Sequence, residues 1–224
     1  MKNEHIKKNH YIAIGDIHGC VNSLEALLEK VSGYNDRTFI FIGDYIDRGP
    51  DSRSVIDLVI GFSEDHDCIF LRGNHEQMFM DALETGDHNL WLLNGGDQTL
   101  SSYNVHYAVE LPSEHIEFFA KTPLWLDTPQ YFFIHGGLDP KRSIKEQCDS
   151  PDIEEFGMWR RDHVDSPVKW EKTLVFGHTP FTEPLHEERK IGIDTGCVFS
   201  RQGYGLLTAV MLPEETFITQ PCLD

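Results

Sequence analysis

The sequence has no long apolar run and no secretory leader pattern. None of its hydrophobic stretches approaches the ~20 residues that a membrane-spanning helix requires, and residues 1–10 lack the apolar core of a signal peptide. We therefore expect a soluble, cytoplasmic protein without a membrane partner.

The sequence also lacks the usual signs of disulfide, zinc-ribbon or covalent chemistry. Its five cysteines are scattered and form no Cys-x-x-Cys pair, so we expect reduced thiols. No cysteine is followed six positions later by arginine, and there is no P-loop and no Gly-x-Ser-x-Gly elbow. Catalysis through a covalent intermediate is therefore not expected.

Basic residues are scarce. The chain has 19 Lys and Arg against 37 Asp and Glu, for a formal net charge of -18. Binding to nucleic acid or to an anionic membrane depends on basic surface, so we expect neither partner. Bound divalent cations would locally reverse this field, so an anionic substrate remains compatible with the composition.

The length and composition suit one α/β domain. The 224 residues, of which 40% are hydrophobic, can bury a sizeable core. We predict this domain over residues 11–224, after an N-terminal tail at 1–10. A helical insertion is expected at about 85–129, where no chemical motif occurs.

Five short apolar runs rich in β-branched and aromatic residues predict buried strands. They cover residues 11–14, 38–42, 68–71, 131–134 and 173–176. A helical pattern separates the first two runs, which indicates a βαβ unit and a parallel sheet. Such sheets bind ligands beyond the carboxyl ends of their strands. Each run ends in a glycine-containing turn with Asp, Asn or His, so these side chains should meet at that edge.

The first two turns carry carboxylates suited to a pair of metal ions. Two divalent cations about 3.5–4 Å apart need a shared oxygen ligand, and Asp44, directly after the second run, is our candidate for it. Asp16 and His18 follow the first run and can offer one metal an oxygen and a nitrogen.

The later turns extend this pattern. Asn74 offers a neutral oxygen, and His75 could be either a ligand or a proton donor. His135 and His178 follow the fourth and fifth runs. Packing alone does not require these residue types at strand ends, so we interpret the five turns as a dinuclear metal site.

Two further segments have a simpler interpretation. Arg160 and Arg161 precede Asp162. An arginine fork suits phosphate, but for this segment taken alone a surface arginine paired with Asp162 is the better interpretation. From residue 185 onward the chain predicts consecutive strands of a second sheet, with Asp194 as a turn residue.

Three linked blocks carry a family resemblance. Gly-Asp-Ile-His-Gly at 15–19, Gly-Asp-Tyr-Ile-Asp-Arg-Gly at 43–49 and Gly-Asn-His-Glu at 73–76 resemble the signature of the phosphoprotein phosphatase family of calcineurin-like metallophosphoesterases. The histidine motifs at 135–137 and 176–180 are similar to the form in its small bacterial and bacteriophage members. The implied fold is two mixed β-sheets packed as a sandwich flanked by helices, with a dinuclear centre at the strand carboxyl ends.

The resemblance also implies roles for individual residues. One metal would be held by Asp16, His18 and Asp44, and the other by Asp44, Asn74, His135 and His178. His75 would be a general acid, kept protonated by Asp47, while Arg48, Asn74 and Arg161 would bind the phosphate; Arg160 is the alternative to Arg161. The metals in similar proteins are usually Mn²⁺, with Fe or Zn in some.

The implied activity is phosphomonoester hydrolysis by direct attack of a metal-bridging hydroxide. We expect a protein phosphatase acting on phosphoserine or phosphothreonine, with phosphotyrosine as a variant. The alternative is hydrolysis of dinucleoside polyphosphates such as diadenosine tetraphosphate, which bacterial relatives with the same Gly-His-Thr-Pro form also perform. A phosphoprotein or a phosphorylated small molecule would then be the substrate. A more remote alternative is an inactive metal- or phosphate-binding module, which the full set of candidate residues disfavours.

Overall fold

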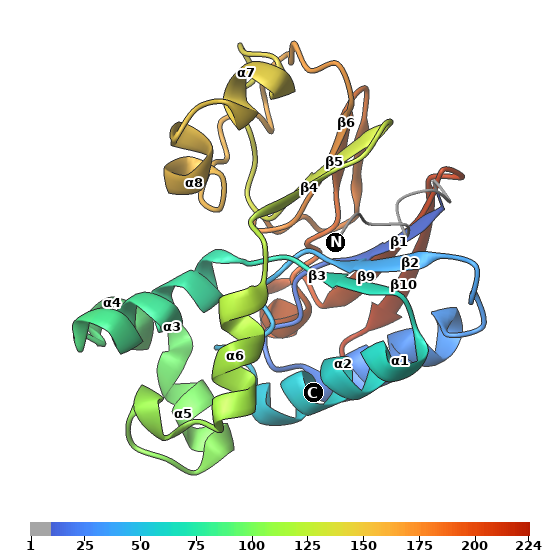
Figure 1. Ribbon diagram of the computed structural model, residues 1–224. Helices are drawn as coiled ribbons and strands as arrows, with labels where there is room; N and C mark the ends of the chain where they lie inside the picture. Colours follow the sequence, from blue (N-terminus) through green and yellow to red (C-terminus); the bar gives the residue numbers. More distant parts are fainter. Residues whose placement is uncertain (1–9) are drawn as a thin grey trace.

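Two five-stranded mixed β-sheets pack against each other at the centre of the molecule, with helices outside them (Figure 1). This computed structural model describes residues 10–224, so the predicted N-terminal tail lies, apart from His10, outside the described residues. The predicted fold class is confirmed. No helix among the described residues is both long and apolar enough to cross a membrane.

The first sheet has the strand order β10-β9-β1-β2-β3. Its strands are β1 (Tyr11–Ile14), β2 (Thr38–Phe41), β3 (Cys68–Phe70), β9 (Leu206–Leu212) and β10 (Thr216–Pro221). The first three are parallel, whereas β9 pairs antiparallel with both β1 and β10. The interpretation of the whole C-terminal part as a second sheet is therefore wrong, because β9 and β10 complete the first sheet.

The second sheet has the order β4-β5-β6-β8-β7. Its strands are β4 (Trp125–Asp127), β5 (Tyr131–Ile134), β6 (Thr173–Phe176), β7 (Leu185–Glu187) and β8 (Lys190–Gly192). The strands β5, β6 and β8 are parallel, and β4 and β7 are antiparallel edges. Strand β4 falls within the predicted helical insertion; three residues are too short to show a strand period.

Helices cover both outer faces. Under the first sheet lie α1 (Val21–Val31) and α2 (Ser52–Asp65), and beside the second sheet lie α7 (Ile144–Cys148) and α8 (Asp152–Phe156) (Figure 1). A helical lobe projects to one side and contains α3 (Asn74–Thr85), α4 (Asn89–Trp91), η2 (Leu92–Gly96), α5 (Asp97–Tyr103), η3 (Ala108–Glu110) and α6 (Ser113–Lys121). A 3₁₀ segment, η4 (Cys197–Gln202), precedes β9.

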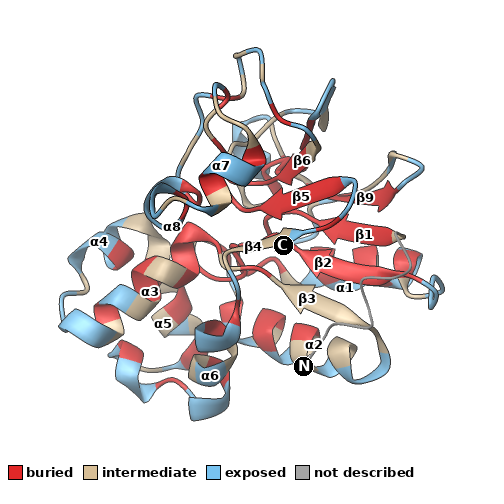
Figure 2. Ribbon diagram, turned by 45° about the horizontal axis from the view of Figure 1, so that its top comes forward, coloured by how far each residue is buried: buried red, intermediate tan, exposed pale blue. Residues whose placement is uncertain are grey.

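The central strands are buried on both faces, which explains why their sequences are continuously apolar. Along β1, Ile12 and Ile14 face the helical side, and Ala13 packs between the sheets with Ile40 and Val175. Figure 2 shows these strands buried, with exposed residues on the outer surfaces of the helices. The polar side chains of the candidate site therefore come from the turns at the strand ends.

Candidate metal centre

The turns after β1, β2, β3, β5 and β6 meet at one edge of the sandwich. Glycines allow this approach: a Cβ on Gly43 would overlap the backbone of Gly73, and a Cβ on Gly177 would overlap the carboxylate of Asp16. The turns of both sheets therefore contribute to a single cluster of polar side chains.

The backbone of this cluster is unusual. Several candidate site residues have a left-handed φ, namely His18 (48°), Asp44 (53°), Asp47 (73°), Arg48 (69°) and His178 (62°). Left-handed backbone costs free energy in residues other than glycine, and such residues concentrate at functional sites, where their surroundings hold them. The strain here lies at the residues that the sequence motifs single out.

Asp44 lies at the centre of the cluster. Its Oδ2 is 3.4 Å from His18 Nε2, 3.3 Å from His135 Nε2 and 4.0 Å from His75 Nε2. Burial raises the pKa of this carboxyl, but the imidazoles of His135 and His75 outweigh that effect and hold the pKa well below its usual range. One carboxylate thus faces several imidazoles, as a ligand shared by two metals would.

Two groups of potential ligands share Asp44. His18, Asp44 and His75 form one group, and Asp44, His135 and His178 form the other; within each group the ligand atoms lie within 4.8 Å of one another. Asn74 joins the second group, because its Oδ1 is 2.9 Å from His135 Nε2 and 2.8 Å from His178 Nδ1.

Asp16 is placed differently. Its carboxylate accepts a hydrogen bond from the backbone N–H of His178, at 3.0 Å from Oδ2. Burial and the nearby Asp194 raise the pKa of Asp16 well above its usual range. Its role as a ligand therefore stays a prediction, but its position beside the His178 turn keeps it at the same edge.

The side chains of the cluster fit a pair of divalent cations. They supply buried carboxylate, amide and imidazole donors, a set suited to first-row divalent metals. Among the described residues nothing hydrogen-bonds to the buried Nε2 of His75, which lies on the Asp44 side. A buried polar atom without a protein partner points to a ligand that the protein itself does not supply.

His75 is oriented by Asp47 through a hydrogen bond of 2.7 Å between Nδ1 and Oδ2. Asp47 also accepts hydrogen bonds from Trp91 Nε1, at 3.0 Å, and from Thr99 Oγ1, at 2.6 Å. Burial outweighs the attraction of Asp44 and lowers the pKa of His75 to about 4. Burial disfavours the protonated imidazole that a general acid needs, so the role of His75 as an acid kept protonated by Asp47 stays a prediction.

Two arginines contact different turns of the centre. Arg48 Nη1 lies 2.8 Å from His18 Nε2, and Arg161 Nη2 donates to the backbone oxygen of His178 at 3.3 Å. Arg160 instead pairs with Asp139 at 3.7 Å and with Asp162 at 3.5 Å. Of the two neighbouring arginines, Arg161 is thus the one that contacts a site turn.

Sequence reasoning missed several buried residues that support the cluster. Glu76 accepts hydrogen bonds from the backbone N–H groups of Asp44 and Tyr45, each at 2.8 Å. Asp194 does sit in a turn and accepts from Gly196 N at 2.9 Å, but it also faces Asp16. The position of Asp194 after an apolar run could have revealed that it lies near the centre. The sequence around Trp91 and Thr99 does not indicate their contacts with Asp47.

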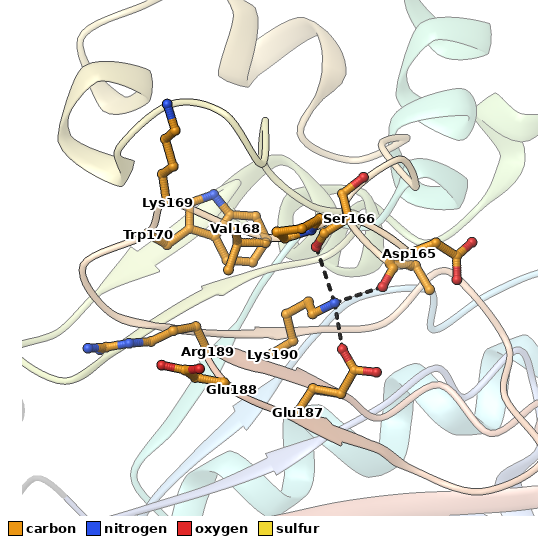
Figure 3. Close-up of a pocket in the computed structure, with 11 residues that line it drawn as sticks. Asp165, Ser166, Val168, Lys169, Trp170, Glu187, Glu188, Arg189 and Lys190 are labelled. Carbon is orange, nitrogen blue, oxygen red and sulfur yellow. Dashed lines mark hydrogen bonds and ion pairs between the residues drawn. The ribbon is translucent and has the colours of Figure 1, made fainter.

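A cavity of about 780 Å³ lies elsewhere, where segment 164–170 faces the turn between β7 and β8. In it Lys190 Nζ donates to Val164 O at 2.7 Å and pairs with Glu187 at 2.6 Å (Figure 3). None of the candidate site residues lines this cavity. Its volume alone therefore does not mark it as the functional site.

Comparison with known proteins gives the family. Residues 10–204 match the model of the calcineurin-like phosphoesterases. The chain is 31% identical to the asymmetrical bis(5'-nucleosyl)-tetraphosphatase PrpE of Oceanobacillus iheyensis, over 92% of this chain and 90% of that protein. A crystal structure whose provisional name is diadenosine tetraphosphatase aligns with a TM-score of 0.68 and 23% identity, over 97% of this chain and 96% of the other.

A protein tyrosine phosphatase has a similar fold. The cold-active enzyme of a Shewanella species aligns with a TM-score of 0.66 and 18% identity, over 95% of this chain and 80% of the other. At that identity the likeness shows the fold alone. The expectation of a serine/threonine protein phosphatase is wrong, because the relative with 31% identity is named a dinucleoside tetraphosphatase. The motifs behind that expectation do not distinguish these two kinds of enzyme.

Proposed function

The chain belongs to the calcineurin-like phosphoesterase family, and within it we propose that the protein hydrolyses dinucleoside tetraphosphates such as diadenosine tetraphosphate. The proposed cleavage is asymmetrical and yields a nucleoside triphosphate and a nucleoside monophosphate. The observation that carries the proposal is the identity of 31% to a tetraphosphatase of that specificity over nearly the full length of both chains.

The proposed cofactors are two divalent metal ions, with Mn²⁺ as the first choice. Asp16, His18 and Asp44 would hold one ion, and Asp44, Asn74, His135 and His178 would hold the other. When bound, such ions lower the pKa of a water molecule and offset the negative charge that develops on the attacked phosphate.

The protein's own groups would bind and orient the phosphate chain. Arg48 and Arg161 contact two different turns of the centre, and a guanidinium fork matches two phosphate oxygens at once. The support for this role is their contact with His18 and with the His178 turn. In a chain of net charge -18, they supply positive charge where a tetraphosphate needs it.

His75 would assist departure of the leaving nucleotide. Its Nδ1 is fixed by Asp47, so Nε2 is the atom that can exchange a proton with the leaving oxygen. A nucleotide phosphate is a weak base and needs less protonation than an alkoxide.

An aromatic ring at the rim suits a nucleoside substrate. Trp159 is 40% exposed, and its ring centroid lies 6.0 Å from that of His178. An exposed indole beside a phosphate site can stack on a base, a contact worth about 1–3 kcal/mol in nucleic-acid complexes. This placement favours a nucleotide over a small phosphate ester that has no aromatic ring.

The test is a substrate panel with the Mn²⁺-reconstituted protein. Diadenosine tetraphosphate should be hydrolysed faster than phosphoserine, phosphothreonine or phosphotyrosine peptides, and chromatography should show ATP and AMP in equal amounts. Two equivalents of ADP would refute the asymmetrical cleavage. Faster turnover of a phosphopeptide would refute the substrate class.

A further inference from the structure

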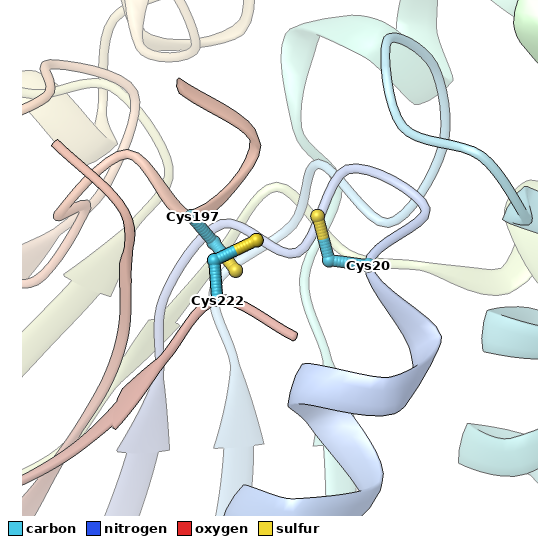
Figure 4. A group of neighbouring side chains, drawn as sticks. All are labelled: Cys20, Cys197 and Cys222. Atoms are coloured by element: carbon cyan, nitrogen blue, oxygen red, sulfur yellow. The ribbon is translucent and has the colours of Figure 1, made fainter. Parts of the chain in front are cut away.

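Three of the five cysteines meet in space although they are far apart in the sequence. Cys20 lies in the turn before α1, Cys197 begins η4, and Cys222 follows β10; their sulfur atoms lie within 4.8 Å of one another (Figure 4). We call Cys20, Cys197 and Cys222 the thiol cluster. Cys68 and Cys148 lie outside it.

The thiol cluster is largely shielded from solvent. Cys20 is 1% exposed and Cys197 is 2% exposed. The contacts of its sulfurs with oxygen are long: Cys20 Sγ lies 3.6 Å from His18 O, and Cys222 Sγ lies 3.7 Å from Asp224 O. Hydrogen bonds with Cys20, Ser23 and Cys222 lower the pKa of the Cys197 thiol against the effect of burial. The sulfurs thus mainly face one another.

The spacing of the sulfurs suits one metal ion. Tetrahedral zinc with Zn–S bonds of about 2.3 Å places its sulfur ligands about 3.8 Å apart. Sulfurs no more than 4.8 Å apart would need to approach by at most about 1 Å. Rotation of the cysteine side chains can move the sulfurs by this distance. The three cysteines also come from separate segments of the chain, so each can adjust independently of the others.

A cavity gives access to the cluster. It has a volume of about 270 Å³ and is lined by Cys20, Cys222, Arg48 and residues of η4, among others. An ion could enter through it, and water within it could complete a tetrahedral site. Three thiolates alone suffice for a trigonal Cu⁺ site.

We propose that the thiol cluster binds one thiophilic d¹⁰ cation, Zn²⁺ or Cu⁺, at a site separate from the dinuclear centre. Soft thiolate ligands select these ions, whereas the carboxylate, amide and imidazole donors at Asp44 select harder ones. A disulfide is the competing use of the same atoms, but it would join only two sulfurs, whereas all three lie together.

The bound ion would join three segments of the chain. Cys20 lies two positions after His18, and Arg48 lines the same cavity. The ion would therefore restrict the movement of the turn that carries His18 and of one wall of the cavity that Arg48 lines. Its main effect should be on stability, since binding to the folded state alone stabilises that state.

The experiment uses Co²⁺ as a spectroscopic probe, with Zn²⁺ and Cu⁺ as competitors, on the full-length protein already loaded with Mn²⁺. A sulfur-to-cobalt charge-transfer band should appear with one equivalent bound, and Zn²⁺ or buffered Cu⁺ should abolish it. Such a band arises only from thiolate ligands. The proposed ligands of the dinuclear centre include no cysteine, so cobalt bound there would not give this band. Whichever competitor acts at the lower free concentration identifies the preferred ion.

Variants separate the cluster from the other thiols. Cys197→Ser and Cys222→Ser should lose the band and the rise in melting temperature that Zn²⁺ gives, whereas Cys148→Ser should keep both. Cys222 is only partly buried, so Cys222→Ser serves if Cys197→Ser does not fold. The proposal is overturned if the native protein shows no band, or if both cluster variants keep it. It is equally overturned if two thiols of the purified protein resist alkylation until a reductant, and not a chelator, is added.

Discussion

The metal centre and the Lys190 cavity both bury charged groups, but they differ in how those groups are satisfied. Lys190 Nζ has Val164 O at 2.7 Å and Glu187 at 2.6 Å, so the protein itself supplies its partners. At the centre, Asp44 faces three imidazoles and His75 Nε2 has no hydrogen-bond partner among the described residues. The first arrangement is complete, whereas the second calls for a further ligand.

This difference in how buried charges are satisfied identifies a functional site better than the volume of a cavity does. The Lys190 cavity has a volume of about 780 Å³, but none of the candidate metal ligands lines it. Left-handed backbone is found at five residues of the metal centre, His18, Asp44, Asp47, Arg48 and His178, whereas among the residues that line the Lys190 cavity it is found at Arg189. Function can account for the cost of this strain at the centre. Substitutions at the two places should therefore separate activity from stability.

The largest effect is expected from Asp44→Asn. The change keeps the shape of the side chain but removes the charge that both proposed metals share, so metal occupancy should fall. Activity should drop by at least about 10³-fold, since metal ions stabilise the transition state by several kcal/mol. Metal analysis of the dialysed protein and kcat/KM for diadenosine tetraphosphate provide the measurement. Full occupancy with normal turnover would remove Asp44 from the centre.

His75→Asn should have the next largest effect. We expect a fall in kcat of roughly 10²-fold, the lower end for a general acid, because the leaving nucleotide needs little protonation. Metal content should be unchanged. Loss of one metal would instead assign His75 to the ligands, as its grouping with His18 and Asp44 permits.

The sequence places the candidate residues at one edge of the sandwich, where the structure also has them, because they lie in the turns directly after apolar runs. Asp44 and His135 each follow a buried strand by no more than three positions, and parallel strands bring their carboxyl ends to one edge. The family motifs do not give the substrate, because a dinuclear metal site can act on a phosphate monoester or on an anhydride. For that reason the protein phosphatase prediction was wrong while the fold prediction was confirmed.

The supporting residues could not be predicted because their contacts join distant parts of the chain. Trp91 and Thr99 reach Asp47 from the helical lobe, and nothing near them in sequence indicates this. The antiparallel pairing of β9 with β1 joins the two ends of the described chain, and a hydrophobic pattern does not name its partner strand. The thiol cluster depends on that same pairing, because Cys222 follows β10.

Lys190→Met tests the structural side of the comparison. The change leaves buried carbonyl groups, including Val164 O, without their donor, which should lower the free energy of unfolding by about 1–3 kcal/mol. Turnover and metal content should stay at the native level. Chemical denaturation and kcat/KM provide the measurement. A large loss of activity in a folded, metal-loaded protein would mean that this cavity belongs to the functional site.

Trp91→Phe probes the link between the helical lobe and the centre, and should have the smallest effect. The substitution keeps a ring in the core but removes the N–H that donates to Asp47 at 3.0 Å. A hydrogen bond to a charged group is worth about 1.5 kcal/mol or more, so kcat should fall about tenfold, with metals retained. Trp125→Phe, on the partly buried strand β4, is the matched control.

The double variant with Thr99→Val extends this test. Because Thr99 still donates to Asp47 in Trp91→Phe, a further loss of kcat in the double variant would show that the lobe orients His75 through Asp47. Native rates in both variants would show that it only packs against the centre.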